Sequence, residues 1–167
     1  MNRHGVVFGL AGLSGSGKTT LAEQLITIFR DRGMSVSTIK HAHHEFDPDI
    51  PGKDSWRHRQ AGAGQVIISS SARRVHFTET PDGSEADLDT LLGDLAPSDI
   101  VLVEGYKKLD FPKIEIHRKE LGHDFLFKTI PTVKLMATDH VYDELAVEQI
   151  GLNNPTGIAD RILKGLD

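Results

Sequence analysis

Hydrophobic residues in this chain fall alternately into short continuous runs and into stripes with helical spacing. Residues 6–10 form an apolar run, typical of a central parallel strand that is covered on both faces. An amphipathic helix is predicted next, from the i, i+4, i+7 and i+8 spacing of Leu21, Leu25, Ile28 and Phe29. Gly33 is placed to close that helix in a left-handed conformation. Residues 35–40 predict a second strand, so the chain opens with a right-handed strand–helix–strand unit.

The middle of the chain is more polar. Residues 41–53 are too rich in polar residues, proline and glycine for regular structure, and we expect a long loop there. A helix is predicted from about Asp54 to Ala61, a buried strand over 65–70 and a short strand near 75–79. Ser84 and Asp87 fit a capping box at the start of a helix that Pro97 ends.

The last third again alternates between strands and helices. Strands are predicted over 100–103, ending in Glu104, over 113–117 with a half-exposed alternation, and over 133–139. A closing helix is predicted over 156–163. This alternation indicates an α/β fold, a three-layer α/β/α sandwich with a mostly parallel sheet, organised as a single domain over 1–167.

Composition narrows the functional classes. The 167 residues are 38% hydrophobic and carry a net charge of −5, which favours a globular protein and argues against broad nucleic-acid binding. We find no apolar run of membrane-spanning length and no secretory leader, so we expect a cytoplasmic protein. The absence of cysteine excludes disulfides and thiolate metal sites.

The stretch GLAGLSGSGKTT carries the strongest chemical signal. It satisfies G-x-x-x-x-G-K-[ST] between a predicted buried strand and the start of an amphipathic helix. Glycines allow the backbone N–H groups to surround phosphate, Lys18 would reach the β- and γ-phosphates, and the Thr19 hydroxyl would bind Mg²⁺. The predicted nucleotide-binding residues are Gly12, Ser14, Gly15, Ser16, Gly17, Lys18, Thr19 and Thr20.

Glu104 ends an apolar strand where a metal-binding carboxylate is expected beside such a loop. Gly105 would leave room for the γ-phosphate. The alternative is that Glu104 caps a neighbouring helix.

The loop KHAHHEFDPDIPGKDS allows three interpretations. Its histidines and acids could bind a transition metal, although no cysteine or fixed helical spacing supports a closed site. The histidines could instead be solvated or hydrogen-bonded to phosphate. The loop could also be a switch ordered by the γ-phosphate. Lys40, Lys53 and Arg59 would supply positive charge to that phosphate or to an anionic second substrate, or would lie on a solvated surface.

Together, GLSGSGKTT, IKHAHH, DPDIPGKDSWRHRQAGA, TETPD and VLVEGYK resemble the molybdopterin-guanine dinucleotide biosynthesis protein B (MobB) family over essentially the whole chain. The resemblance implies a GTP-binding P-loop protein, homodimeric, with weak GTPase activity at most. It would assist a separate guanylyltransferase that attaches GMP to molybdopterin, and molybdopterin itself is a further candidate ligand. The implied signature surface comprises His41, His43, His44, Lys53, Asp54, Arg59, Gly105 and Lys107.

The sequence motifs support specificity for guanine less strongly than they support binding of a nucleoside triphosphate. No N-K-x-D element follows a late strand, and Asp139 is the carboxylate that would accept hydrogen bonds from guanine N1 and N2. Two other functions remain open: a small-molecule kinase that uses ATP, and a GTP-driven metal chaperone. A kinase would need an arginine-bearing lid, and Arg57, Arg59, Arg73 and Arg74 are scattered between predicted strands.

Overall fold

The computed structural model describes residues 3–42, 46–80 and 82–166. Its contacts group into two units, residues 1–41 with 94–167 and residues 42–93. The single-domain organisation of 1–167 stays a prediction. The first unit contains the strands β1 (Val6–Ala11), β2 (Val36–Lys40), β5 (Ile100–Glu104), β6 (Lys113–His117), β7 (Val133–Thr138) and β8 (Glu148–Gly151) and the helices α1 (Lys18–Asp31) and α4 (Pro155–Leu163). It also contains the short 3₁₀ helices η1 (Lys119–Leu121) and η2 (Leu126–Lys128).

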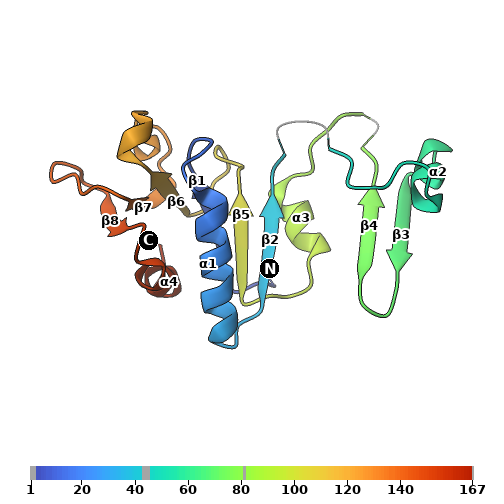
Figure 1. Cartoon of the computed structure of the whole chain (residues 1–167), viewed down its shortest axis with the longest axis horizontal. Coiled ribbons are helices and arrows are strands. Elements are labelled where there is room, and N and C mark those ends of the chain that lie inside the picture. The colour runs from blue at the N-terminus through green and yellow to red at the C-terminus, as the bar shows by residue number, and fades with distance from the viewer. Residues whose placement is uncertain (1–2, 43–45, 81, 167) are drawn as a thin grey trace. The chain divides into compact units, whose positions relative to one another are not determined.

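The six strands form one parallel sheet in the order β2-β5-β1-β6-β7-β8 (Figure 1). β1 lies in the middle, between β5 and β6. This confirms the predicted α/β fold with helices flanking a parallel sheet. Because all strands run the same way, their carboxyl ends share one edge of the sheet, which is where ligands of open α/β folds bind.

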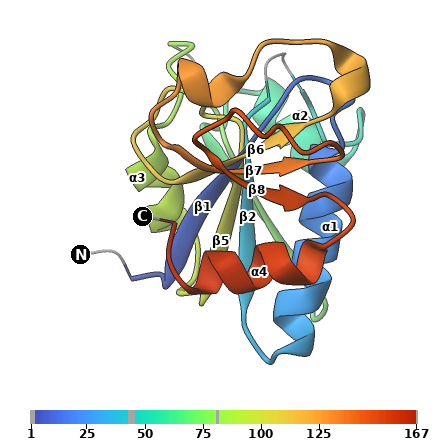
Figure 2. The same cartoon turned by 90° about the vertical axis from the view of Figure 1, so that its left-hand side faces the viewer.

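One face of the sheet packs against α1 and α4. Figure 2 views the sheet from its β8 side and shows α4 beside α1. The predicted helix is confirmed in α1, whose Leu21, Leu25 and Phe29 are buried. Gly33 follows α1 with φ 79°, the predicted left-handed closure. The sheet residues of this core include Phe8, Leu10, Ile100, Leu102, Ile114, Ile116, Leu135 and Ala137.

Polar side chains lie on the opposite face of β6. Ile114 and Ile116 belong to the helix-side core, so Lys113, Glu115 and His117 point the other way, because side chains alternate along a strand. All five residues of β6 are buried, so the prediction of a half-exposed strand was wrong. The alternation of apolar and polar residues marks two buried faces of different chemistry. The helix-side core covers one face, and the backbone of Leu126 and Phe127 donates hydrogen bonds to Glu115 on the other.

The second unit contains α2 (Asp54–Gln60), β3 (Gln65–Ser69), β4 (Arg74–Thr78) and most of α3 (Leu88–Asp94). β3 and β4 form a two-stranded antiparallel hairpin. Residues 65–69 are a strand as predicted, but not a buried one, because Ile67 is 60% and Ile68 is 43% exposed. An apolar run alone does not distinguish a strand inside a sheet from one in a two-stranded hairpin.

Two further elements differ from the sequence-based expectation. α3 begins at Leu88, and the Asp87 carboxylate accepts a hydrogen bond from the Thr90 N–H at 2.7 Å, so Asp87 caps the helix in place of Ser84. β8 was missed: its four residues are too few and too polar for a strand pattern, and pairing with β7 creates it. No helix in the described ranges combines the length and apolar character that a membrane span requires.

Candidate nucleotide site

The glycine loop joins β1 to α1 at the carboxyl edge of the sheet, as predicted. Gly15 and Gly17 have φ values of 79° and 95°, which favour glycine, and Gly17 caps α1. A Cβ on Gly12 would lie 2.6 Å from Ser16 Oγ and 2.8 Å from the Ile116 carbonyl oxygen. The loop backbone therefore turns closely around the end of β1, with the α1 N-terminus directly behind it, the arrangement that binds phosphate.

Lys18 folds back over the loop. Its Nζ donates to the carbonyl oxygens of Gly12 at 3.2 Å and Leu13 at 2.7 Å. Burial lowers the pKa of Lys18, and the positive charges of Lys107 and Lys40 lower it further, while Glu104 opposes them. The three lysines thus share one electrostatic environment at the loop, and a polyanion there would relieve their mutual repulsion.

The end of β5 supplies the carboxylate. Glu104 lies in register with Leu10 of β1 and with Lys40 of β2. Its side chain is 13% exposed, and its Oε2 lies 3.6 Å from Lys40 Nζ. Carboxylate and hydroxyl oxygens are the donors that Mg²⁺ prefers, so Glu104 and Thr19 have the right chemistry for that ion.

Directly after β5 the backbone is tightly turned. Gly105 has φ 94° and Tyr106 has φ 48°, an unusual value for a residue with a side chain. A Cβ on Gly105 would lie 2.6 Å from the Cβ of His41. The His41 N–H donates to the Glu104 carbonyl at 2.8 Å, and its ring lies 4.7 Å from the Tyr106 ring. Gly105 is therefore needed for close approach to His41.

Arg118 is a site residue that the sequence analysis missed. Its Nε donates to the Ser16 carbonyl at 3.1 Å, and a Cβ on Gly17 would lie 3.4 Å from its Nη2. Arg118 directly follows β6, the strand beside β1, so it lies next to the glycine loop. Strand order was needed to find it, because 102 residues separate Arg118 from Ser16.

Asp139 lies beside Arg118. Its Oδ1 accepts a hydrogen bond from the Lys119 N–H at 3.0 Å, and its Oδ2 lies 3.6 Å from Arg118 Nη1. Asp139 thus positions the segment after β6. Its role in binding guanine stays a prediction.

The predicted signature residues divide between the two units. His41, Gly105 and Lys107 belong to the unit that carries the loop, whereas Lys53, Asp54 and Arg59 belong to the second unit. His43 and His44 lie outside the described residues. A single surface formed by all eight stays a prediction.

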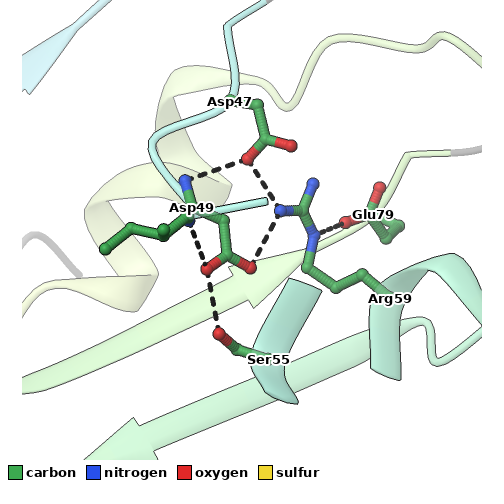
Figure 3. Close-up of polar contacts among 6 residues, drawn as sticks. Asp47, Asp49, Ser55, Arg59 and Glu79 are labelled. Atoms are coloured by element: carbon green, nitrogen blue, oxygen red, sulfur yellow. Dashed lines mark hydrogen bonds and ion pairs between the residues drawn. The ribbon is translucent and has the colours of Figure 1, made fainter. Parts of the chain in front are cut away.

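Arg59 is surrounded by carboxylates (Figure 3). Its Nη1 lies 2.7 Å from Asp47 and 3.3 Å from Asp49, and its Nε lies 2.5 Å from Glu79. The guanidinium also packs over the Phe77 ring at 5.0 Å. In this arrangement Arg59 neutralises acidic residues of its own unit, so its charge is not directed to a phosphate. Asp47 and Asp49, candidates for a transition-metal site in the sequence, are used in the same cluster.

Comparison with known proteins decides the family. A sequence model described as molybdopterin guanine dinucleotide synthesis protein B, MobB, matches residues 7–139. The chain belongs to the MobB family. Its relatives include molybdopterin-guanine dinucleotide biosynthesis adapter proteins from two bacteria. The Escherichia coli K12 protein is 38% identical over 160 residues, covering 95% of this chain and 91% of the relative. The Haemophilus influenzae protein is 46% identical over 121 residues, covering 72% of this chain and 68% of the relative.

Solved MobB structures share the fold. A crystal structure of molybdopterin-guanine biosynthesis protein B covers 95% of this chain and 99% of its own, with a TM-score of 0.73 and 23% identity. The match to the crystal structure of Bacillus subtilis MobB covers 97% of this chain and 98% of that structure's chain, with a TM-score of 0.73 and 24% identity. The MobB resemblance in the sequence is confirmed, and the chain is an adapter protein of molybdopterin-guanine dinucleotide biosynthesis. Nucleotide binding is the property that its P-loop implies.

Proposed function

We propose that this MobB protein binds GTP with Mg²⁺ at the loop Gly12–Thr20 and presents or slowly hydrolyses it while assisting a guanylyltransferase that joins GMP to molybdopterin. One observation carries the nucleotide part: Lys18 lies over the glycine loop at the N-terminus of α1, with Lys107 and Lys40 near enough to lower its pKa. The triphosphate is the ligand class that would complement three lysines and a helix N-terminus together.

In this proposal each loop residue has a defined task. Backbone N–H groups of residues 15–19 bind the β- and γ-phosphates, and Lys18 exchanges its contacts with the Gly12 and Leu13 carbonyls for phosphate oxygens. Thr19 and Glu104 hold Mg²⁺, directly or through water. When bound, the ion neutralises phosphate charge. Both carbonyl groups that Lys18 contacts belong to the same loop, so a rotation of the Lys18 side chain is enough to move Nζ from these carbonyls to phosphate.

Slow turnover follows from the groups at the loop. Arg118 already contacts the loop backbone through Ser16, so it is the arginine best placed to stabilise developing phosphate charge. It is also tied to Asp139, which would limit its movement toward the γ-phosphate. We therefore expect intrinsic hydrolysis on the order of 10⁻⁴ to 10⁻² per second, a range that spans P-loop GTPases without an arginine finger and those that carry the arginine in the same chain.

The proposal includes a homodimer that docks on the guanylyltransferase. A two-stranded hairpin is only marginally stable by itself, and β3 presents the exposed Ile67 and Ile68. Ile67 and Ile68 are consecutive on β3 and point to opposite faces of the hairpin, so a second copy packed on one face would bury one of the two side chains. Light scattering should then report twice the chain mass, and Ile67→Lys with Ile68→Lys should yield a folded monomer. A monomeric parent protein would remove this part of the proposal.

The nucleotide part is tested by calorimetric titration with GTP, ATP and their non-hydrolysable analogues in Mg²⁺, with phosphate release followed on the same samples. We expect GTP to bind selectively and Lys18→Ala to abolish binding. Lys134→Ala is the matched control, because Lys134 is an exposed lysine near the amino end of β7, whereas the loop lies at the carboxyl edge of the parallel sheet. Binding of neither nucleotide would refute the proposal. A preference for ATP would favour the kinase alternative and require a search for a phosphoryl acceptor.

A further inference from the structure

Three side chains with metal-ligand chemistry come together at the face of β6 opposite the helix-side core. Glu115 and His117 come from β6, and His123 comes from the segment between η1 and η2. One ligand atom from each lies within 4.8 Å of the others. The Glu115 side chain is fully buried and that of His117 is 3% exposed, whereas His123 is half-buried. The cluster is therefore inside the protein and reaches the surface at His123.

The backbone holds the carboxylate of this cluster in place. Glu115 Oε1 accepts from the Leu126 N–H at 2.8 Å, and Oε2 accepts from the Phe127 N–H at 2.9 Å. Each carboxylate oxygen has two lone pairs, so Oε1 keeps one that is not used by Leu126. Oε1 is also the atom nearest to the His117 ring, at 3.8 Å from Nδ1. That separation is too long for a hydrogen bond.

Both histidines have one ring nitrogen engaged and present the other to the cluster. His123 Nδ1 lies 3.1 Å from the Asp124 carbonyl, which can only accept, so His123 Nε2 carries a lone pair. His117 Nε2 lies 3.1 Å from the Tyr142 hydroxyl, and when it donates there, Nδ1 carries the lone pair. Among the described residues, His117 Nδ1 and His123 Nε2 are buried atoms without a hydrogen-bond partner.

We propose that Glu115, His117 and His123 bind a divalent transition-metal ion, with zinc as the favoured ion. Two imidazoles and one carboxylate are a known zinc ligand set, and the partners of the other ring nitrogens orient the ligands. Tetrahedral zinc with bonds of about 2.1 Å separates its ligand atoms by roughly 3.4 Å, so ligand atoms that lie within 4.8 Å of one another would approach by up to about 1.4 Å on binding the ion. A water molecule or an outside group would complete the coordination.

The surroundings favour an ion over a hydrogen-bonded histidine pair. The rings of Phe125 and Tyr142 lie 4.7 and 5.5 Å from the His117 ring and limit access of water. The buried Glu115 carboxylate would gain a counter-charge from the ion. The ion would also tie the segment after Arg118 to β6.

The test is zinc binding by the full chain, measured by elemental analysis after gel filtration and by calorimetry against a competing chelator. We expect one Zn²⁺ per chain in the parent protein. His123→Gln and His117→Phe should each weaken binding at least ten-fold. X-ray absorption should show only nitrogen and oxygen ligands, with two imidazoles. Thermal unfolding of each variant establishes that it is folded, and the half-buried His123 is the position least costly to change.

Two controls separate this cluster from other histidines. His76→Gln changes an exposed histidine on β4 and should leave zinc binding unchanged. Combined replacement of His41, His43 and His44 by Gln should also retain one Zn²⁺. Loss of zinc in this combined variant, with full binding in His123→Gln, would overturn the proposal and assign the ion to the histidine-rich loop. Absence of stoichiometric binding in the parent would overturn it as well. Neither outcome bears on GTP binding, which is measured separately.

Discussion

The guanidinium of Arg118 donates a hydrogen bond to the Ser16 carbonyl, so the residue that follows β6 supports the backbone of the phosphate loop. Asp139, which follows β7, lies 3.6 Å from the same guanidinium. Two neighbouring strands therefore stabilise the loop from one side. The other side of the loop faces the end of β5, since β1 pairs with both β5 and β6.

Arg118→Ala should weaken GTP binding about ten-fold, which corresponds to ~1.4 kcal/mol, because the loop loses a charge-assisted hydrogen bond. Calorimetry of GTP binding in Mg²⁺ measures the change. Arg30→Ala, an exposed arginine on α1, serves as the control and should bind like the parent protein. Equal affinities for Arg118→Ala and the parent would mean that this contact does not order the loop.

Gly12→Ala should destabilise the protein by about 2–3 kcal/mol, since the new Cβ would meet the Ile116 carbonyl and Ser16 Oγ in a closely packed loop. Gly15→Ala meets no atom within 4 Å, and its cost of about 1 kcal/mol comes from the positive φ alone. Denaturant unfolding gives the free energy of unfolding of both variants, and the difference compares the cost of the steric clash at Gly12 with the cost of the positive φ at Gly15. The reverse order of stabilities would show that backbone conformation matters more than space at this loop.

Lys113 predicts a pH dependence at the alkaline end. Burial lowers its pKa from 10.5 to about 8, although its Nζ donates to Thr132 Oγ1 and to the Phe111 carbonyl, each at 3.0 Å. Between about pH 8 and 10.5 the unfolded chain keeps the proton that the folded chain has released, so the free energy of unfolding should rise with pH.

The measurement for Lys113 compares the free energy of unfolding of the parent protein and Lys113→Met across this range. Lysines with the same pKa in both states cancel in the difference. We expect the rise with pH to be absent in Lys113→Met. A rise of the same size in both proteins would assign it to another group.

Arg59→Met should loosen the second unit, because Asp47, Asp49 and Glu79 lose the cation that neutralises them (Figure 3). Limited proteolysis should cut the variant faster within residues 42–93. Arg57→Met changes an exposed arginine on the same helix and should be cut like the parent.

The same cluster predicts a dependence on acid pH. The hydrogen bond from Arg59 lowers the pKa of Asp47 below its usual 3.8, so Asp47 contributes stability above that value and loses it as the pH falls through the lowered pKa. This acid dependence should be smaller in Arg59→Met. Unchanged proteolysis and unchanged acid sensitivity would mean that the carboxylates are solvated well enough without Arg59.

Local pattern was sufficient for the elements around the glycine loop. The helical stripe of α1, the closure at Gly33 and the position of Glu104 at a strand end all follow from spacing along a few consecutive residues. The exposure of strands was predicted less well. β3 was expected to be buried and is exposed, and β6 was expected to be half-exposed and is buried, because exposure depends on which other elements cover the faces of a strand. β8 needed its pairing with β7 before it could be recognised.

The family, the α/β alternation and the phosphate loop with Lys18 and Thr19 could be predicted from the sequence, because they depend on local spacing and on motifs carried by neighbouring residues. The position of β6 beside β1 became known only from the folded chain. That position brings Arg118 to the loop and buries Glu115 and His117 beside His123. Strand order depends on how much apolar surface the whole sheet buries against its helices. That quantity involves residues from every strand, so a short stretch of sequence cannot reveal it.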